Sequence, residues 1–231
     1  MVGTNGRWVR DRTQLVFAIA LAVVVGLFLA RSPWAPFRSD AGTAATQVSQ
    51  EELLKQMNQD PGAARRLERV DMAISYATPP GTLATALAKA ELAVNGTVET
   101  SQFQIRADGL VYTLVTMVVD ESFKGSVKPG DRLTFMQSGG PVVYPSAHGD
   151  REPQLLQSKA DPILLPGDQA IVLLAGADYT PKGIFVPAWP FTSQYRLEGG
   201  RVAAIPGNPF AAEVSGLPAA TFAERVTEAT R

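Results

Sequence analysis

The chain has 231 residues, 45% of them hydrophobic, with 21 basic against 22 acidic residues. It contains no cysteine, which excludes disulfide bonds, lipid-modified cysteines and a thiol nucleophile. This charge balance provides no concentrated basic surface for a phosphate backbone, so we expect no nucleic-acid partner.

The N-terminal region contains an uncharged apolar stretch at residues 15–30. A helix of this length covers about 24 Å of a roughly 30 Å hydrocarbon layer. The residues on either side of it make up the remaining length, which gives a predicted transmembrane helix at 13–34. Three arginines in the predicted cytoplasmic tail, residues 1–12, favour an inside N-terminus. The alternative is a cleaved signal peptide followed by secretion. Either interpretation places the rest of the chain outside the cytoplasm.

Residues 35–48 are rich in proline and small polar residues and read as a linker, and a helical region is expected at 49–90. Ser49 with Glu52 forms a capping box, and Asp60-Pro61 is a favourable helix start. Apolar residues then recur at helical spacing, which predicts a second helix; they are Leu67, Val70, Ile74 and Ala77. A third short helix is expected over 82–91.

From Glu91 the spacing of the apolar residues changes from helical to that of a strand. A long strand is expected as far as Ile105, with Gly96 marking a bulge. A second strand over 110–123 follows the Asp108-Gly109 turn. The sequences KPGD at 128–131 and LPGD at 165–168 both predict tight turns, because proline fixes φ at the second position and glycine accepts a positive φ at the third.

Residues 139–166 are polar and broken by prolines, which predicts a long loop outside the core, a lid or docking segment. Short closing strands follow up to residue 206, and the C-terminal segment 207–231 contains a helix that Thr221 and Glu224 are expected to cap. The predicted fold is mainly β with flanking helices (α+β). Its body, residues 91–206, is expected to be a small OB-like antiparallel β-barrel preceded by the transmembrane helix and a helical stalk.

Three motifs carry a resemblance: AELAVNGTVE at 90–99, FKGSVKPGD at 123–131 and PGDQAIVLLA at 166–175. Together they resemble OB-type barrels of the netrin and metalloprotease-inhibitor kind and similar exported bacterial domains. The likeness covers about half of the chain and implies a small barrel. Inhibitors of that family act through an N-terminal cysteine held by disulfides, and this chain has no cysteine, so their mechanism is not carried over.

One segment gathers an imidazole with carboxylates: His148, Asp150 and Glu152, with Asp161 further along. Such alternating ligands could hold a divalent cation and support a metal-assisted hydrolase with the loop 139–166 as its lid. A solvated acidic loop explains the same residues and is the interpretation we favour, so no metal and no cofactor is expected.

No catalytic residue is assigned. Asp120 and Glu121 are adjacent on a predicted strand and therefore face opposite ways. Ser138 lacks the flanking pattern of a nucleophile elbow, and the chain has a single histidine to act as its base.

The aromatic segment FVPAWPFTSQY contributes the candidate ligand-binding residues Trp189, Phe191 and Tyr195. Aromatic rings on a barrel face can stack on sugars or anchor a protein. Core packing is the alternative and is favoured.

These observations together predict a single-pass membrane protein whose extracytoplasmic domain binds a protein or another cell-envelope component without catalysis. The alternatives are the metal-assisted hydrolase described above and a saccharide-binding module. An enzyme is the less favoured class because nucleophiles and imidazoles are scarce.

Overall fold

The computed structural model describes residues 48–72, 80–145, 151–178, 180–189 and 192–229. The predicted tail, the transmembrane segment and almost all of the linker fall outside these ranges. None of the helices in the described ranges is both long and apolar enough to span a membrane. The chain divides into two compact units, and the second, Thr46–Arg231, contains all the elements given below.

Short helices flank the strands of this unit. They are α2 (Gln50–Gln59), the 3-10 helix η1 (Pro61–Arg66), α3 (Leu83–Lys89), α4 (Ala211–Val214) and α5 (Ala219–Glu228). The predicted cap at Ser49 is confirmed, because its hydroxyl accepts a hydrogen bond from the Glu52 amide at 3.1 Å. The predicted cap at Thr221 is wrong: α5 begins two residues earlier, after Pro218.

Ten strands make up most of the unit. They are β1 (Glu68–Asp71), β2 (Leu92–Ile105), β3 (Val111–Lys124), β4 (Arg132–Ser138), β5 (Gly140–Pro145), β6 (Arg151–Gln157), β7 (Gln169–Gly176), β8 (Ile184–Pro187), β9 (Gln194–Glu198) and β10 (Arg201–Ala204). The expected class, mainly β with a few helices, is therefore confirmed.

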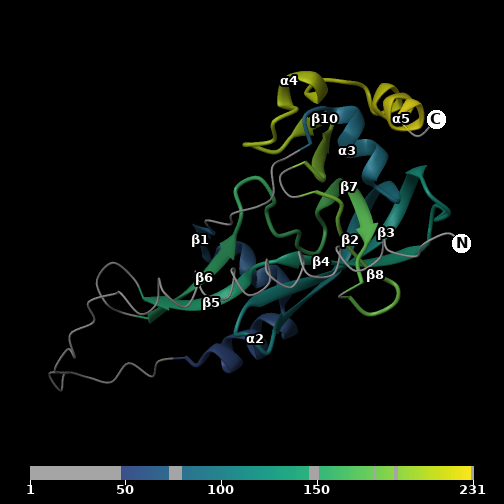
Figure 1. Cartoon of the computed structure of the whole chain (residues 1–231). Coiled ribbons are helices and arrows are strands. Elements are labelled where there is room, and N and C mark those ends of the chain that lie inside the picture. Colours follow the sequence, from purple (N-terminus) through teal and green to yellow (C-terminus); the bar gives the residue numbers. More distant parts are fainter. Residues whose placement is uncertain (1–47, 73–79, 146–150, 179, 190–191, 230–231) are drawn as a thin grey trace, which may run out of the picture. The chain divides into compact units, whose positions relative to one another are not determined.

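The larger sheet has the order β10-β9-β7-β2-β3-β4-β8, and β8 pairs a second time, with β7. One edge of β7 is shared: β9 pairs with its first half, at Ala170 to Val172, and β8 with its end, at Leu174 to Gly176. Because β9 and β10 continue the sheet outward from β7, the sheet is not a clean barrel. Figure 1 shows α3, α4 and α5 gathered near β10 and β7, with α2 at the opposite end near β5.

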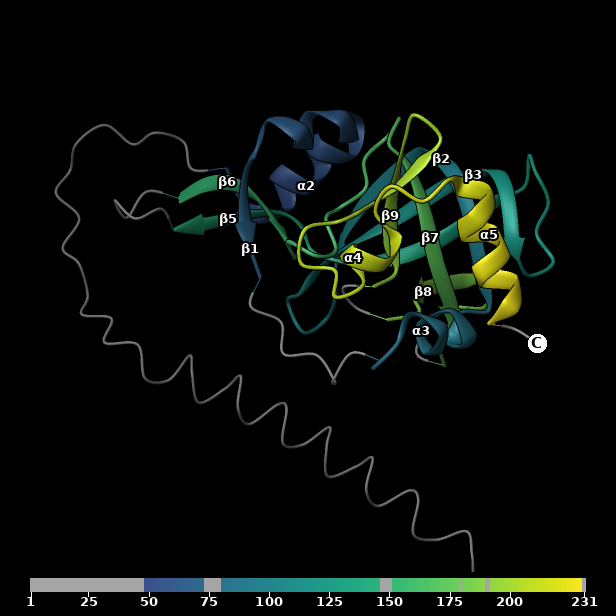
Figure 2. The same cartoon turned by 90° about the horizontal axis from the view of Figure 1, so that it is seen from above.

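A second, smaller sheet has the order β1-β6-β5. Its strand β1 corrects the predicted helix over Leu67 and Val70, because the helical stretch after Pro61 ends as a 3-10 turn at Arg66. Val70 pairs in parallel with Leu156, so a long-range partner overrides the helical period of the apolar residues. Figure 2 shows β1, β6 and β5 side by side next to α2.

Residues 139–166 are not the loop that the sequence predicted. They form the β5–β6 hairpin and then an extended buried segment, Pro162–Leu165, in which Ile163 and Leu165 are both at most 5% exposed. Leu155 of β6 is fully buried with Phe103 and Ala64 in a core cluster beneath α2 and η1. Pro141 and Pro153 lie within β5 and β6, and Pro153 pairs with Val143, so these prolines do not keep the region out of the sheet.

The two Pro-Gly-Asp turns have the same geometry. Gly130 and Gly167 have φ values of +89° and +87°, as the predicted turns require. In each turn the aspartate carboxylate accepts from the amide three residues earlier: Asp131 from Lys128 at 2.8 Å, and Asp168 from Leu165 at 2.7 Å. A strand begins directly after each turn: β4 after Asp131 and β7 after Asp168.

Candidate functional site

The buried segment Pro162–Leu165 is held by side chains from strands of the larger sheet. Ser101 of β2 donates to the Leu164 carbonyl at 2.9 Å. The Gln137 amide of β4 accepts from the Leu164 N–H at 3.0 Å and donates to the Pro162 carbonyl at 3.1 Å. Buried backbone outside regular structure must find such partners, because an unpaired group costs about 1–3 kcal/mol. The segment is therefore a fixed wall.

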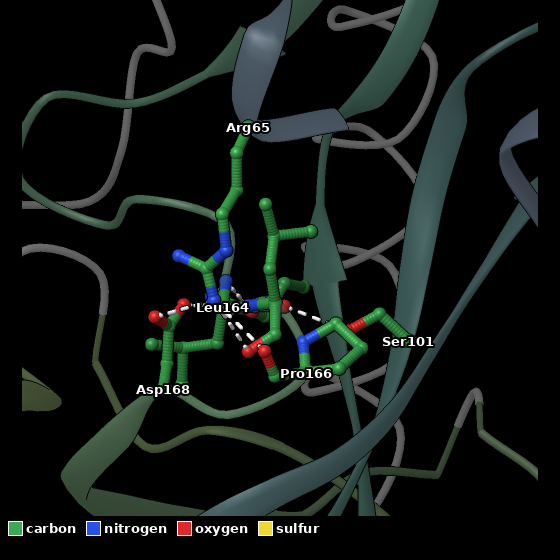
Figure 3. Close-up of polar contacts among 7 residues, drawn as sticks. Arg65, Ser101, Leu164, Pro166 and Asp168 are labelled. Carbon is green, nitrogen blue, oxygen red and sulfur yellow. Dashed lines mark hydrogen bonds and ion pairs between the residues drawn. The ribbon is translucent and has the colours of Figure 1, made fainter. Parts of the chain in front are cut away.

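Arg65, at the end of η1, fixes the turn that follows this wall. Its guanidinium lies 2.9 Å from the Asp168 carboxylate and donates to the Pro166 carbonyl at 2.9 Å (Figure 3). Asp168 in turn holds the Leu165 amide. The side chain of Arg65 thus joins η1 to the turn before β7, about a hundred residues further along the chain.

A cleft of about 310 Å³ opens between this wall and β9. Its charged and polar lining consists of Arg65, Arg69, Asp168, Gln169, Gln194, Arg196, Glu198 and the buried Tyr195, and its apolar lining includes Pro162, Leu164 and Ile205. Gln194, Arg196 and Glu198 alternate along β9, so their side chains lie on one face of the strand.

The arginines of the cleft differ in their partners. Arg65 forms an ion pair with Asp168. The side chains of Arg69 and Arg196 are exposed and form no hydrogen bond or ion pair with any described residue. Glu198 is also exposed and unpaired within the described ranges. The cleft therefore carries two unpaired guanidinium groups against one unpaired carboxylate.

A buried acid lies beside the floor of the cleft. Gln194 is 2% exposed and Asp161 is 7% exposed, and the Gln194 Nε2 donates a hydrogen bond to Asp161 Oδ1. Burial raises the pKa of Asp161 to about 7, and the nearby Gln137 amide offsets only part of this shift. The Gln194 Oε1 has no hydrogen-bond partner in the structure. The cleft thus has an unused buried acceptor in its lining.

Sequence comparison assigns the chain to no family. No protein-family model matches the chain, and no curated protein matches its sequence. The cleft is interpreted from its own residues.

The candidate metal ligands do not meet in the described residues. His148 and Asp150 lie outside them, and Glu152 sits on β6 opposite Tyr144. Asp161 is buried against Gln194 instead. In the described ranges, no three His, Asp or Glu side chains are grouped to hold a metal ion.

The aromatic candidates do not share one exposed face. Tyr195 is fully buried, its ring centroid 5.1 Å from that of Phe222, so its ring fills the core as the favoured alternative expected. Trp189 is half-buried against the same cluster, with Lys89 Nζ 4.4 Å from its ring centroid. Phe191 lies outside the described residues.

Sequence reasoning missed the residues of the cleft because they come from three distant segments: 65–69, 162–170 and 194–205. Two signals were present. Polar residues occur at core positions of predicted strands, at Ser101 and Gln137, and both turn out to bind the wall. The apolar run at Ile163 to Leu165, within a segment read as an exposed loop, was the other signal.

Proposed function

We propose that this chain is a membrane-anchored extracytoplasmic binding domain that takes its ligand in the cleft between the Pro162–Leu165 wall and β9, without catalysing a reaction. The uncharged stretch at residues 15–30 supports the anchor. The observation that carries the binding function is the cleft itself: its wall is fixed by Arg65, Ser101 and Gln137, while the Gln194 acceptor in its lining is unused.

The body of the domain is proposed to be an OB-like barrel built from β2, β3, β4, β7 and β8. Its support is the pairing of β8 with both β4 and β7, which joins the five strands in a ring. A five-stranded, partly open barrel is the architecture of OB folds. In this interpretation β9 and β10 are additions, and the cleft lies where the addition β9 meets the barrel strand β7.

The chemistry of the lining favours binding over catalysis. The described residues of the lining include no serine, threonine, histidine or lysine. Asp168 already holds both Arg65 and the Leu165 amide. Glu198 is the one unpaired carboxylate among the described residues of the lining, and no serine, threonine, histidine or lysine lies there for it to activate; the remaining arginine and glutamine side chains bind and orient ligands.

The absence of cysteine permits a direct test with single-cysteine variants of the full-length chain. Gln169→Cys places a thiol in the cleft lining, and Gln102→Cys places one at an exposed position of β2 away from it. In right-side-out membrane vesicles, a membrane-impermeant maleimide should label both without lysis. Adding an extract of the parent cell envelope should slow the labelling of Gln169→Cys only.

Two results would contradict the proposal. Labelling that requires lysis would place the domain in the cytoplasm. Equal labelling rates of the two thiols with and without the extract would show that no envelope component occupies the cleft.

A further inference from the structure

We propose that the ligand of this cleft is a small monoanionic carboxylate that also carries hydroxyl or amino donors, the chemistry of a sugar acid. This inference rests on the proposed binding function and names its ligand class. It places the carboxylate between Arg69 and Arg196, with a donor of the ligand directed at Gln194, whose buried Oε1 must turn toward the cleft to accept it.

The charge of the ligand follows from two arginines whose side chains have no partner among the described residues. Arg65 makes contacts that hold the turn at Leu165 to Asp168, so its role is structural. Arg69 and Arg196 line the same cleft from different elements, β1 and β9, and bind no described residue. A guanidinium group presents paired N–H donors that match a carboxylate.

The donor on the ligand follows from Gln194. Its Nε2 is engaged by Asp161, so its Oε1 is left as the acceptor, and the side chain is 2% exposed. A buried acceptor without a partner is unfavourable, and a ligand hydroxyl or N–H would satisfy it. Inorganic phosphate carries O–H donors as well, but near neutral pH much of it bears a second negative charge, which the Glu198 carboxylate in the lining disfavours.

The volume of the cleft and the carboxylate of Glu198 restrict the class of ligand further. A volume of about 310 Å³ is at the lower end of small-molecule sites, which span roughly 300–1,000 Å³. Glu198 lines the cleft as an unpaired carboxylate and would repel a second negative charge. A monoanion of about monosaccharide size, with several donors, is compatible with all these groups.

The test is isothermal titration of the full-length chain in detergent with three probes: glucuronate, glucose as the neutral analogue, and inorganic phosphate. We expect glucuronate to bind one per chain and to bind more tightly than either of the others. Arg69→Gln and Arg196→Gln should each weaken glucuronate binding by about 10-fold or more, because each removes a charged hydrogen bond. Arg66→Gln is the matched control, since Arg66 is exposed and outside the lining, and its effect should stay below about 2-fold.

The remaining outcomes overturn the inference. If glucose binds as tightly as glucuronate and the arginine variants bind both normally, the cleft is a binding site but not for an anion. If phosphate binds more tightly than glucuronate, the cleft prefers a more highly charged anion and the proposed class of monoanionic carboxylate is wrong. If no probe binds up to about 10 mM while the envelope extract still protects Gln169→Cys, the binding function survives and this ligand class does not.

Discussion

Gln194 and Asp161 are 33 residues apart in the chain and are joined by a hydrogen bond inside the domain, with Gln194 Nε2 donating to Asp161 Oδ1. Both side chains are almost fully buried, and no arginine or lysine of the described residues forms an ion pair with Asp161. The carboxyl group is therefore desolvated beside the cleft with only neutral amides for partners. This arrangement makes the stability of the domain sensitive to pH.

Asp161 is predicted to destabilise the domain as pH rises from about 4 to about 7. Its pKa is raised from 3.8 to about 7 by burial. Within this window the unfolded chain has lost the proton while the folded chain keeps it, so stability decreases with pH and levels off above the window. A shift of about three pKa units corresponds to a total effect of at most about 4 kcal/mol. Urea unfolding of the full-length chain at a series of pH values measures this slope.

The variant Asp161→Asn should lose this part of the pH dependence and be more stable than the parent at pH 8, because a neutral amide replaces the buried carboxylate. Asp131→Asn is the control, since it makes the same substitution at an exposed aspartate, in the turn at Lys128 to Asp131. If Asp161→Asn and the parent show parallel curves of stability against pH, the carboxyl group is not protonated in the folded chain near neutral pH.

The link between Arg65 and Asp168 should contribute modestly to stability and more to the position of the turn. Their side chains are 42% and 29% exposed, so solvent screens the pair, and Arg65→Gln is expected to cost about 1 kcal/mol. Arg66→Gln should be nearly neutral, because Arg66 is exposed and its side chain forms no hydrogen bond or ion pair with the described residues. A double-mutant cycle with Asp168→Asn measures the coupling; a value of zero would mean that the two side chains act on the Leu165–Asp168 turn independently, each through its own hydrogen bonds to the backbone.

Local signals account for the parts of the fold that the sequence predicted correctly. The turn at Lys128 to Asp131, the long strands on either side of Asp108-Gly109 and the bulge at Gly96 each depend on a few adjacent residues. The strand β1 could not be predicted, because the apolar residues around it recur at helical spacing. Its strand conformation depends on pairing with β6, where Val70 lies opposite Leu156, far along the chain. The cleft could not be predicted for the same reason: Arg69 and Arg196 become neighbours of one cavity only after folding.

The two Pro-Gly-Asp turns should respond equally to substitution of their glycines. At Gly130 and Gly167 an added Cβ meets no atom within 4 Å, so the cost of alanine is the positive φ itself, about 1–2 kcal/mol. Gly81→Ala is the matched control, because this glycine also has open space but no positive φ, and we expect no loss of stability there. Denaturant midpoints of the three variants give the comparison; a cost at Gly167 well above that at Gly130 would show that the cleft-side turn is additionally strained.

Gly96→Ala should be the most damaging glycine substitution of those considered, although its φ is ordinary. The register of β2 against β3 shifts between Asn95 and Gly96, and this bulge brings β3 close to the glycine. An added Cβ would overlap the Val118 carbonyl and lie 2.7 Å from Met117 Cγ. The carbonyl belongs to the central strand β3 and cannot withdraw without disturbing its pairing with β4, so we expect a loss of about 3 kcal/mol or a chain that does not fold. Thermal unfolding of Gly96→Ala and Gly81→Ala in parallel measures the difference, and a loss below about 1 kcal/mol would mean that the bulge relaxes and that the close approach of β2 and β3 is not required by the fold.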